Sequence, residues 1–414
     1  ATAIATTTAQ IVEAARGAGF DAKQAARIKK RFGIDVYQPR LVSEQGLRRA
    51  QGLVAARIAS RSAAIGGAAS SSHVDAAKRY GLLAKGTMAH LFVTSFPSSK
   101  EIEAFRAYAR AHPDAAVFLI DTYGTLSGAN NAALVGQELK QAGHQLIGVR
   151  LDSGDIAALS RQVRKILDRA GLQQAKIFAS DDLDAPRIKK MLSRGAHLDA
   201  LGVGTRMSTG GKQSYLRMRV RRVKKATAGK GRGKDGMRVV LRHGRRQGRA
   251  AATSEAIARA AQGLAKLAGR LKDAMPKAPA KSRQRKKKRS RAKDKETTGL
   301  VLDKYHLTMA NAFWNEGKHQ ERAAFNSYVR LPPFGKDHIV TSGLSFFLEH
   351  LKNFRFSDSD IAYLGEAGDL DPKFLDYLRT FRFRGDILAM REGSVAFGHE
   401  PVMQVTGNII EAAI

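Results

Sequence analysis

The 414-residue sequence predicts an α/β fold with parallel strands, joined to a second domain of mixed α and β structure. Short apolar runs alternate with helix-like stretches between residues 117 and 202, and a polar cluster follows each run. The composition also changes sharply near residue 217 and again near residue 300. Strand–helix alternation with short turns requires parallel strands, but it leaves open whether the sheet is doubly wound or closed into a barrel.

The residues before the alternating block are expected to be mainly helical over positions 1–60. By composition alone, Arg48 and Arg49 would belong to a solvated helix face. The Gly/Ser loop at 65–72 could hold an anion on its backbone N–H groups, although such a loop is more often a simple turn. His90 precedes an apolar run, where an isolated histidine is usually a structural residue.

The alternating block is predicted from buried apolar runs that are separated by amphipathic stretches. Strands are expected at residues 117–120, 146–149, 176–179 and 198–202, and helices at residues 132–141, 156–167 and 185–192. Polar groups at the carboxyl ends of parallel strands are where α/β folds place their chemistry. The residues following these runs are therefore the candidate functional residues.

The residue types at these strand ends point to a phosphorylated sugar and a metal ion. They are Asp121, Arg150, Asp152, Asp155, Ser180, Asp181, Asp182, Gly202, Gly204 and Thr205. Carboxylates suit Mg²⁺ or ribose hydroxyls, and Mg²⁺ favours oxygen ligands that it shares with substrate phosphates. Arg150 can bind a phosphate or carboxylate through two hydrogen bonds. The Gly-rich turn before Thr205 offers backbone donors for a monophosphate.

Most of the net charge of +34 lies in one segment, which holds 29 Lys and Arg against 5 Asp and Glu between Arg217 and Glu296. Period-two alternation predicts that residues 215–221 and 237–243 pair as a hairpin. An amphipathic helix is expected at 257–275, before a charged linker at 281–295. The segment lacks aromatic residues and hence base-stacking platforms, so a flexible linker is favoured over non-specific phosphate-backbone binding.

Residues 300–414 return to an ordinary composition and predict a mixed α+β domain. A helix is expected to open at residue 302 and to contain the only tryptophan, Trp314. Further helices are expected at 342–351 and 357–364, and strands at 324–331, 385–391 and 395–398.

Composition also excludes several classes of protein. The chain has no cysteine, which excludes disulfides, thiolate metal sites and cysteine nucleophiles. No apolar stretch is long enough to span a bilayer, and residues 1–15 lack the pattern of a signal peptide. We therefore expect a cytoplasmic protein.

In combination, these motifs resemble those of the nicotinate phosphoribosyltransferases. The strand ends match as Ile120-Asp121-Thr-Tyr, Gly148-Val-Arg150-Leu-Asp152-Ser-Gly-Asp155 and Gly202-Val-Gly-Thr205, and two earlier substrate loops match as Gly46-Leu-Arg48-Arg49-Ala-Gln-Gly52 and Ile65-Gly-Gly67. Gly86-Thr-Met-Ala-His90 is similar to the loop that carries the family's phosphorylated histidine. Leu302-Asp303-Lys-Tyr305-His-Leu-Thr-Met309 and Arg330-Leu-Pro-Pro-Phe334 resemble the family's amino-terminal domain.

The order of the segments differs from that of the family, because the part that resembles the amino-terminal domain comes last. The chain thus resembles a circular permutant, with a break between Ile414 and Ala1 where a helix is expected. The expected domains are a catalytic α/β barrel at 1–216, a basic hairpin, helix and linker segment at 217–299, and the α+β domain at 300–414.

The resemblance implies a TIM-like α/β barrel that transfers 5-phosphoribosyl from phosphoribosyl pyrophosphate to nicotinate, with Mg²⁺ and coupled ATP hydrolysis. The implied catalytic residues are His90, Asp121, Arg150 and Asp152, with Asp152 and Asp155 holding the metal. The implied substrate-binding residues are Tyr305, Arg48, Arg49, Thr87, Ser180, Asp181, Gly202, Gly204 and Thr205. In the family the tyrosine matched by Tyr305 comes from a second subunit, which implies a homodimer.

Two alternatives stay open at this point. A nicotinamide or quinolinate phosphoribosyltransferase would share the barrel, and product formation with each substrate separates them. The basic segment could instead make the chain a nucleic-acid-binding protein on a degenerate enzyme scaffold, which deletion of residues 217–296 would test through salt-dependent DNA binding.

Overall fold

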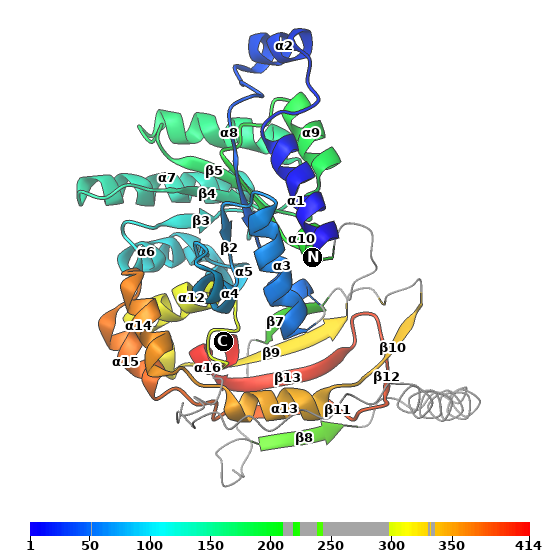
Figure 1. The fold of residues 1–414 in the computed structure, drawn as a ribbon. Helices are drawn as coiled ribbons and strands as arrows, with labels where there is room; N and C mark the ends of the chain where they lie inside the picture. The colour runs from blue at the N-terminus through cyan, green and yellow to red at the C-terminus, as the bar shows by residue number, and fades with distance from the viewer. Residues whose placement is uncertain (51, 210–217, 224–237, 243–297, 330–331, 333–335) are drawn as a thin grey trace, which may run out of the picture.

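The computed structural model describes the chain except for residues 51, 210–217, 224–237, 243–297, 330–331 and 333–335 (Figure 1). The helix predicted at 257–275 and the charged linker at 281–295 lie outside the described residues. In the part that is described, no helix is both long and apolar enough to cross a membrane.

A six-stranded sheet forms the first part of the molecule, with all of its neighbouring strands parallel. Its strands are β1 (Leu41–Glu44), β2 (Ser70–Ser71), β3 (Val117–Leu119), β4 (Gly148–Leu151), β5 (Lys176–Ala179) and β6 (Ala200–Val203), in the order β2-β1-β6-β5-β4-β3. The predicted parallel α/β architecture is confirmed. Within the described residues β2 and β3 are the two edges of this sheet, so closure into a barrel stays a prediction.

The connecting helices follow the predicted alternation. The three predicted helices are α7 (Thr125–Gln141), α8 (Ile156–Arg169) and α9 (Ala185–Ser193), and α6 (Glu101–Ala111), which was not predicted, precedes β3. β3 is buried along its whole length, and the ring of Phe118 stacks on that of Phe105 in α6 at 4.9 Å between centroids. Continuous burial of a strand on both faces is typical of a parallel sheet covered by helices.

The first 60 residues are less uniformly helical than predicted. Helices α1 (Thr2–Ala15), α2 (Ala22–Phe32) and α3 (Leu53–Ile65) are present, but β1 lies between α2 and α3 and pairs with both β2 and β6. This strand has only four residues, and its buried positions include Glu44. A charged residue at a buried position breaks the apolar pattern by which short strands are recognised.

The second sheet has five strands, in the order β7-β9-β13-β11-β8. They are β7 (Met218–Val223), β8 (Arg238–Arg242), β9 (Arg322–Val329), β11 (Asp386–Met390) and β13 (Pro401–Asn408). The predicted hairpin is wrong, because β7 pairs with β9 and β8 pairs with β11 at opposite edges. Period-two alternation predicts that a segment is a strand but not which strand it pairs with. Here β9, β13 and β11 form the centre of the sheet, and β7 and β8 each pair with one of its two outer strands.

The remaining elements complete the predicted α+β domain and the connections within the first part. They are α4 (Val74–Tyr80), α5 (His90–Thr94), α10 (Thr205–Thr209), α12 (Lys304–Asn315), β10 (His338–Val340), α13 (Leu344–Asn353), α14 (Asp358–Glu366), α15 (Pro372–Arg379), β12 (Val395–Phe397) and α16 (Ile409–Ala413). β10 and β12 form a separate antiparallel pair.

The two parts of the molecule share one hydrophobic core. Leu307, Met309 and Phe313 of α12 belong to the same buried cluster as the strands of the parallel sheet. The rings of Phe92 and Phe313 lie 4.9 Å apart, and Arg110 of α6 forms a hydrogen-bonded ion pair with Glu316 at 2.8 Å. Helix α12 is thereby fixed against the sheet.

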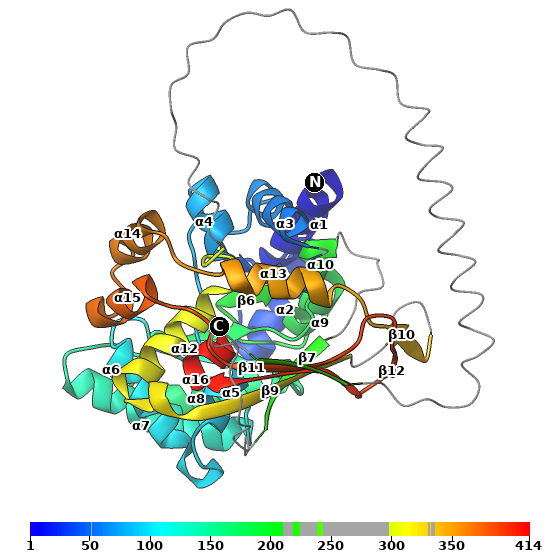
Figure 2. The same cartoon turned by 90° about the horizontal axis from the view of Figure 1, so that it is seen from below.

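The chain ends lie apart in both views of the molecule (Figures 1 and 2). Helix α16 ends at Ala413 and α1 begins at Thr2. A helix thus adjoins each chain end, and the expectation of one helix across the break between Ile414 and Ala1 stays a prediction.

Gly128 offers a test of the packing between α7 and β3. A Cβ at this position would lie 2.1 Å from the carbonyl oxygen of Ile120, a backbone atom that cannot turn away. We expect Gly128→Ala to lower the free energy of unfolding by about 1–3 kcal/mol in denaturant titrations.

Gly365→Ala in α14 is the matched control. Its Cβ would meet only Leu375 Cδ1, at 3.7 Å, so the helix propensity of alanine should leave stability unchanged or raise it by about 0.5–1 kcal/mol. Equal stability of the two variants would contradict the close packing at Gly128.

Candidate functional site

The predicted polar residues lie together at the carboxyl ends of the parallel strands. Asp121 follows β3, Asp152 follows β4, Ser180 follows β5 and Gly204 follows β6. Because these strands are parallel neighbours, their carboxyl ends lie side by side. The structure thus confirms the predicted row of strand ends, and the contacts below show which of its members touch.

Asp152 is the centre of the first cluster. Ser180 donates a hydrogen bond to Asp152 Oδ1, and His90 Nε2 lies 3.8 Å from Asp152 Oδ2. Burial raises the pKa of Asp152, but its contacts with His90 and Ser180 and the positive charge of Arg150 outweigh burial and hold that pKa at about 2. The carboxylate is therefore ionised throughout the physiological pH range.

His90 is the first residue of α5, and its two ring nitrogens face different partners. Nδ1 lies 3.0 Å from Thr122 Oγ1, whereas Nε2 faces Asp152. The side chain keeps 41% of its surface exposed, so a ligand can reach the ring. A histidine that is oriented by a hydroxyl and a carboxylate but still accessible suits chemistry on the ring better than a purely structural role.

Asp121 and Arg150 each bring a buried polar atom without a partner to this cluster. Asp121 Oδ2 accepts hydrogen bonds from Asp152 N at 3.0 Å and from Ser153 Oγ at 2.5 Å. Asp121 Oδ1 and Arg150 Nε have no hydrogen-bond partner in the described part of the chain, although Arg150 Nη2 donates to Met88 O at 2.6 Å. Buried polar atoms are rarely left unpaired, so these two favour a ligand or ion here.

The second cluster joins the two parts of the molecule through Arg48 and Tyr305. The guanidinium carbon of Arg48 lies 5.9 Å from the centroid of the Tyr305 ring, within the range of a cation–π interaction. Arg48 Nη1 also donates to the buried Asp303 at 3.4 Å, and Ser72 Oγ donates to the same carboxylate at 2.5 Å. Arg48 and Tyr305 thus meet within one chain.

The loop that carries His90 packs directly on α12. Thr308 Oγ1 donates to Thr87 O at 2.5 Å, so the contact of Thr87 is made by its backbone. A Cβ on Gly86 would lie 2.4 Å from Tyr305 N, so the close approach of the two backbones requires glycine there. His90 and Tyr305 are therefore held by one packed unit.

Gly202, Gly204 and Thr205 place a neighbouring loop. A Cβ on Gly202 would lie 2.5 Å from the side-chain oxygen of Gln45, and Gln45 N donates to Val203 O at 2.8 Å. Thr205 is buried at the start of α10. This packing positions Gln45, which lies just before the 3₁₀ helix that carries Arg48. The binding of phosphate by Gly202, Gly204 and Thr205 stays a prediction.

Three of the predicted site residues, Asp155, Asp181 and Arg49, are not part of the contacts that form the two clusters. Asp155 caps α8 through Ala158 N and pairs with Arg194 at 2.6 Å, and Asp181 pairs with Arg187 at 2.5 Å. Arg49 lies on the short 3₁₀ helix beside Arg48. The described residues contain no group of three or more His, Asp or Glu that could hold a metal, so the role of Asp155 as a ligand stays a prediction.

Sequence reasoning overlooked Thr122, Asp303 and Glu44 as site residues. Asp303 occupies the N-cap position of α12, where aspartate is usually explained by capping, yet it makes no capping hydrogen bond and accepts from Arg48 and Ser72 instead. Glu44 is buried and accepts from Ser60, Ser71 and Gly46 N. Burial raises the pKa of Glu44 despite these hydrogen bonds. Asp303 could have been found from the sequence, because it is a carboxylate within the motif at residues 302–309 that resembles the family.

Comparison with known proteins identifies the family. Residues 41–236 match the nicotinate phosphoribosyltransferase (NAPRTase) family, and residues 300–414 match the N-terminal domain of NAPRTase. The chain is 44% identical over 196 residues to a nicotinate phosphoribosyltransferase of Bacillus subtilis, which covers 47% of this chain and 38% of that protein. It is 39% identical over 226 residues to one of Mycobacterium tuberculosis, covering 55% of this chain and 46% of the relative.

Among solved structures, human nicotinic acid phosphoribosyltransferase is similar with a TM-score of 0.41 and 28% identity, covering 49% of this chain and 46% of that one. The chain spans less than half the length of each of these relatives in the matched regions. The two family matches together span about three quarters of the chain, and the N-terminal domain of the family comes after the catalytic segment. The chain therefore belongs to the nicotinate phosphoribosyltransferase family, with its segments in permuted order.

Proposed function

We propose that the chain transfers 5-phosphoribosyl from phosphoribosyl pyrophosphate to the ring nitrogen of nicotinate, releasing pyrophosphate, with ATP hydrolysis coupled to the reaction. The observation that carries this proposal is the position of His90, which faces Thr122 and Asp152 on the same packed unit as Tyr305. The names of the relatives supply the substrate and the reaction.

The strand-end carboxylates suit the charge that develops during the transfer. Departure of pyrophosphate leaves an oxocarbenium-like ribose, and fixed negative charge beside it lowers the barrier. Asp152 is held ionised, and Asp121 presents a buried oxygen without a partner in the described residues. Ser180 and Asp181 would flank the ribose phosphate, and Gly202, Gly204 and Thr205 would hold the 5′-phosphate.

The same oxygens fit a Mg²⁺ ion. Magnesium is usually held by one or two carboxylates together with substrate phosphates, so a site of three protein carboxylates is not required. Asp152 with Asp121 or Asp155 would hold the ion, and the geometry favours Asp121 because Asp155 pairs with Arg194. When bound, the ion would neutralise charge on the departing pyrophosphate.

Arg48 and Tyr305 would recognise nicotinate. The guanidinium can pair with the carboxylate of the substrate, and the phenol ring can stack on the pyridine. Arg49 and Thr87 complete the proposed substrate contacts, and Arg150 would bind pyrophosphate or the nicotinate carboxylate. A substrate that carries an amide in place of the carboxylate would lose the pairing with Arg48, which is why we propose nicotinate over nicotinamide.

The finer architecture also belongs to this proposal. We propose that the catalytic domain, residues 1–216, is a TIM-like barrel. The basic segment would span residues 217–299, and the α+β domain residues 300–414. A homodimer of cytoplasmic protein is proposed from the family, and light scattering of the purified chain would test the dimer. The test of the activity itself is formation of nicotinate mononucleotide from nicotinate, phosphoribosyl pyrophosphate and ATP, with nicotinamide and quinolinate as competing substrates.

His90→Ala should abolish the stimulation of product formation by ATP but retain the rate measured without ATP. The reason is that the proposed phosphoryl acceptor is lost while the carboxylates remain. Rates with and without ATP measure this directly. His144→Ala is the control, because His144 pairs with Asp114 at the surface, away from the strand ends. Persistent ATP stimulation in the His90 variant would contradict the assignment.

Asp152→Asn should lower kcat about 10²–10³-fold, because a charge aimed at the developing cation is removed. The same residue predicts a dependence of stability on pH. The pKa of Asp152 is about 2 in the folded protein, below the value of about 3.9 in the unfolded chain. Ionised Asp152 therefore stabilises the fold above about pH 4, and this contribution is lost as the pH falls toward 2. Unfolding followed against pH in both proteins should show the variant losing that acid-side dependence. Asp114→Asn serves as the surface control, and wild-type kcat in Asp152→Asn would refute the role.

The pairing of Arg48 and Tyr305 within one chain predicts that inactive variants do not complement each other. A mixture of Arg48→Ala and Tyr305→Ala chains, unfolded and refolded together, should stay as inactive as either variant alone. If Tyr305 served a partner subunit instead, mixed dimers would contain one intact site and activity would return. Refolded wild type controls for recovery of the fold.

A further inference from the structure

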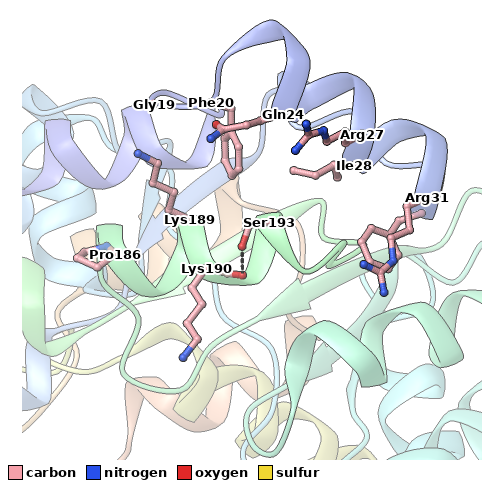
Figure 3. Close-up of a pocket in the computed structure, with 11 residues that line it drawn as sticks. Gly19, Phe20, Gln24, Arg27, Ile28, Arg31, Pro186, Lys189, Lys190 and Ser193 are labelled. Carbon is pink, nitrogen blue, oxygen red and sulfur yellow. Dashed lines mark hydrogen bonds between the residues drawn. The ribbon is translucent and has the colours of Figure 1, made fainter.

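A cavity of about 670 Å³ lies between helices α2 and α9 (Figure 3). In Figure 1 α2 lies at the top of the molecule, whereas α5 and α12, which carry His90 and Tyr305, lie near its middle. The cavity is lined by Gly19, Phe20, Gln24, Arg27, Ile28, Arg31, Phe32, Pro186, Lys189, Lys190 and Ser193. The proposed transfer reaction uses none of these residues.

The charged groups around this cavity all have the same sign. Arg27, Arg31, Lys189 and Lys190 line it, whereas no carboxylate does, although Figure 3 shows the amine of Lys190 pointing away from α2. None of these four cations forms a salt bridge with any residue that the structure describes. Several uncompensated positive charges around one concave surface raise the local concentration of anions, most strongly of those with more than one charge.

The cavity also has an apolar wall. Phe20 and the buried Ile28 lie on the side of α2, and Pro186 lies on α9. The ring of Phe32 is already in contact with Arg31 and Arg161, whose guanidinium carbons lie 5.1 and 4.9 Å from its centroid. Phe20 is therefore the aromatic ring open to a ligand, and Figure 3 shows Lys189 extending from α9 toward Gly19 beside it.

We propose that this cavity binds a nucleoside phosphate. The base would lie against Phe20, where Arg27 can stack on its other face, and the phosphate would pair with Lys189, while Arg31 adds positive charge at the other end of the cavity. The volume is within the range of small-molecule sites. An inorganic anion would leave the apolar wall unused, and an uncharged aromatic compound would leave the cations uncompensated.

Photolabelling with 8-azido-AMP tests the proposal on the full chain. The label should attach to peptides from residues 19–32 and 186–193, and unlabelled AMP should compete for it. The double variant Arg27→Gln/Arg31→Gln should reduce labelling of residues 186–193 at least about tenfold, since the stacking guanidinium and a second positive charge are lost. Residues 186–193 are the readout because the variant does not alter them.

Lys23→Gln/Lys30→Gln is the matched control. It removes the same charge from exposed positions of the same helix that do not line the cavity, so labelling should be unchanged. An equal loss in both double variants would show a general effect of charge and overturn the proposal. Label confined to the strand-end site would also overturn the proposal. Competition by a single-stranded oligonucleotide but not by AMP would overturn it as well, because it would indicate a nucleic-acid-binding surface.

Discussion

The packing of α12 against the loop at 86–90 is the contact on which the candidate site depends. Thr308 bonds to the backbone of Thr87, and Gly86 lets the backbone of Tyr305 approach. Through this contact the α+β domain brings Tyr305 to Arg48, and the same loop fixes His90 between Thr122 and Asp152. Without it, the strand ends would keep their carboxylates but lose both the aromatic ring and a fixed histidine.

Electrostatics at the sheet edge reinforces this arrangement. Burial alone would favour a neutral Asp152, yet His90, Arg150 and Ser180 together keep its pKa at about 2. The charge is thus maintained by residues from three different segments, which is costly unless the site uses it. Glu44 shows the opposite outcome, because burial raises its pKa although three donors surround it. The two buried carboxylates therefore differ, because neighbouring groups determine the pKa of Asp152 whereas burial determines that of Glu44.

Sequence patterns were sufficient for the parallel strands β3 to β6 and for the residues at their ends, since apolar runs and the polar groups after them are local features. They failed where partners are distant. β7 and β8 were recognised as strands, but their pairing with β9 and β11 depends on edges contributed by residues after 320. β1 was missed because its buried Glu44 is satisfied by Ser60 and Ser71, which no local pattern reveals. Asp303 was missed for the same reason, since its partners Arg48 and Ser72 lie far away in the chain.

The permuted order of the family segments has a physical counterpart in these long-range contacts. Arg48 and Asp303 are separated by 255 positions, yet they form a hydrogen bond at 3.4 Å. Such contacts depend on which surfaces meet, whereas chain order decides only the entropy of bringing them together, which grows slowly with loop length. Because α12 buries Leu307, Met309 and Phe313 in the core of the parallel sheet, its position is set by packing and not by its place in the sequence. The contacts that hold α12 against the parallel sheet are therefore compatible with the permuted order of the segments.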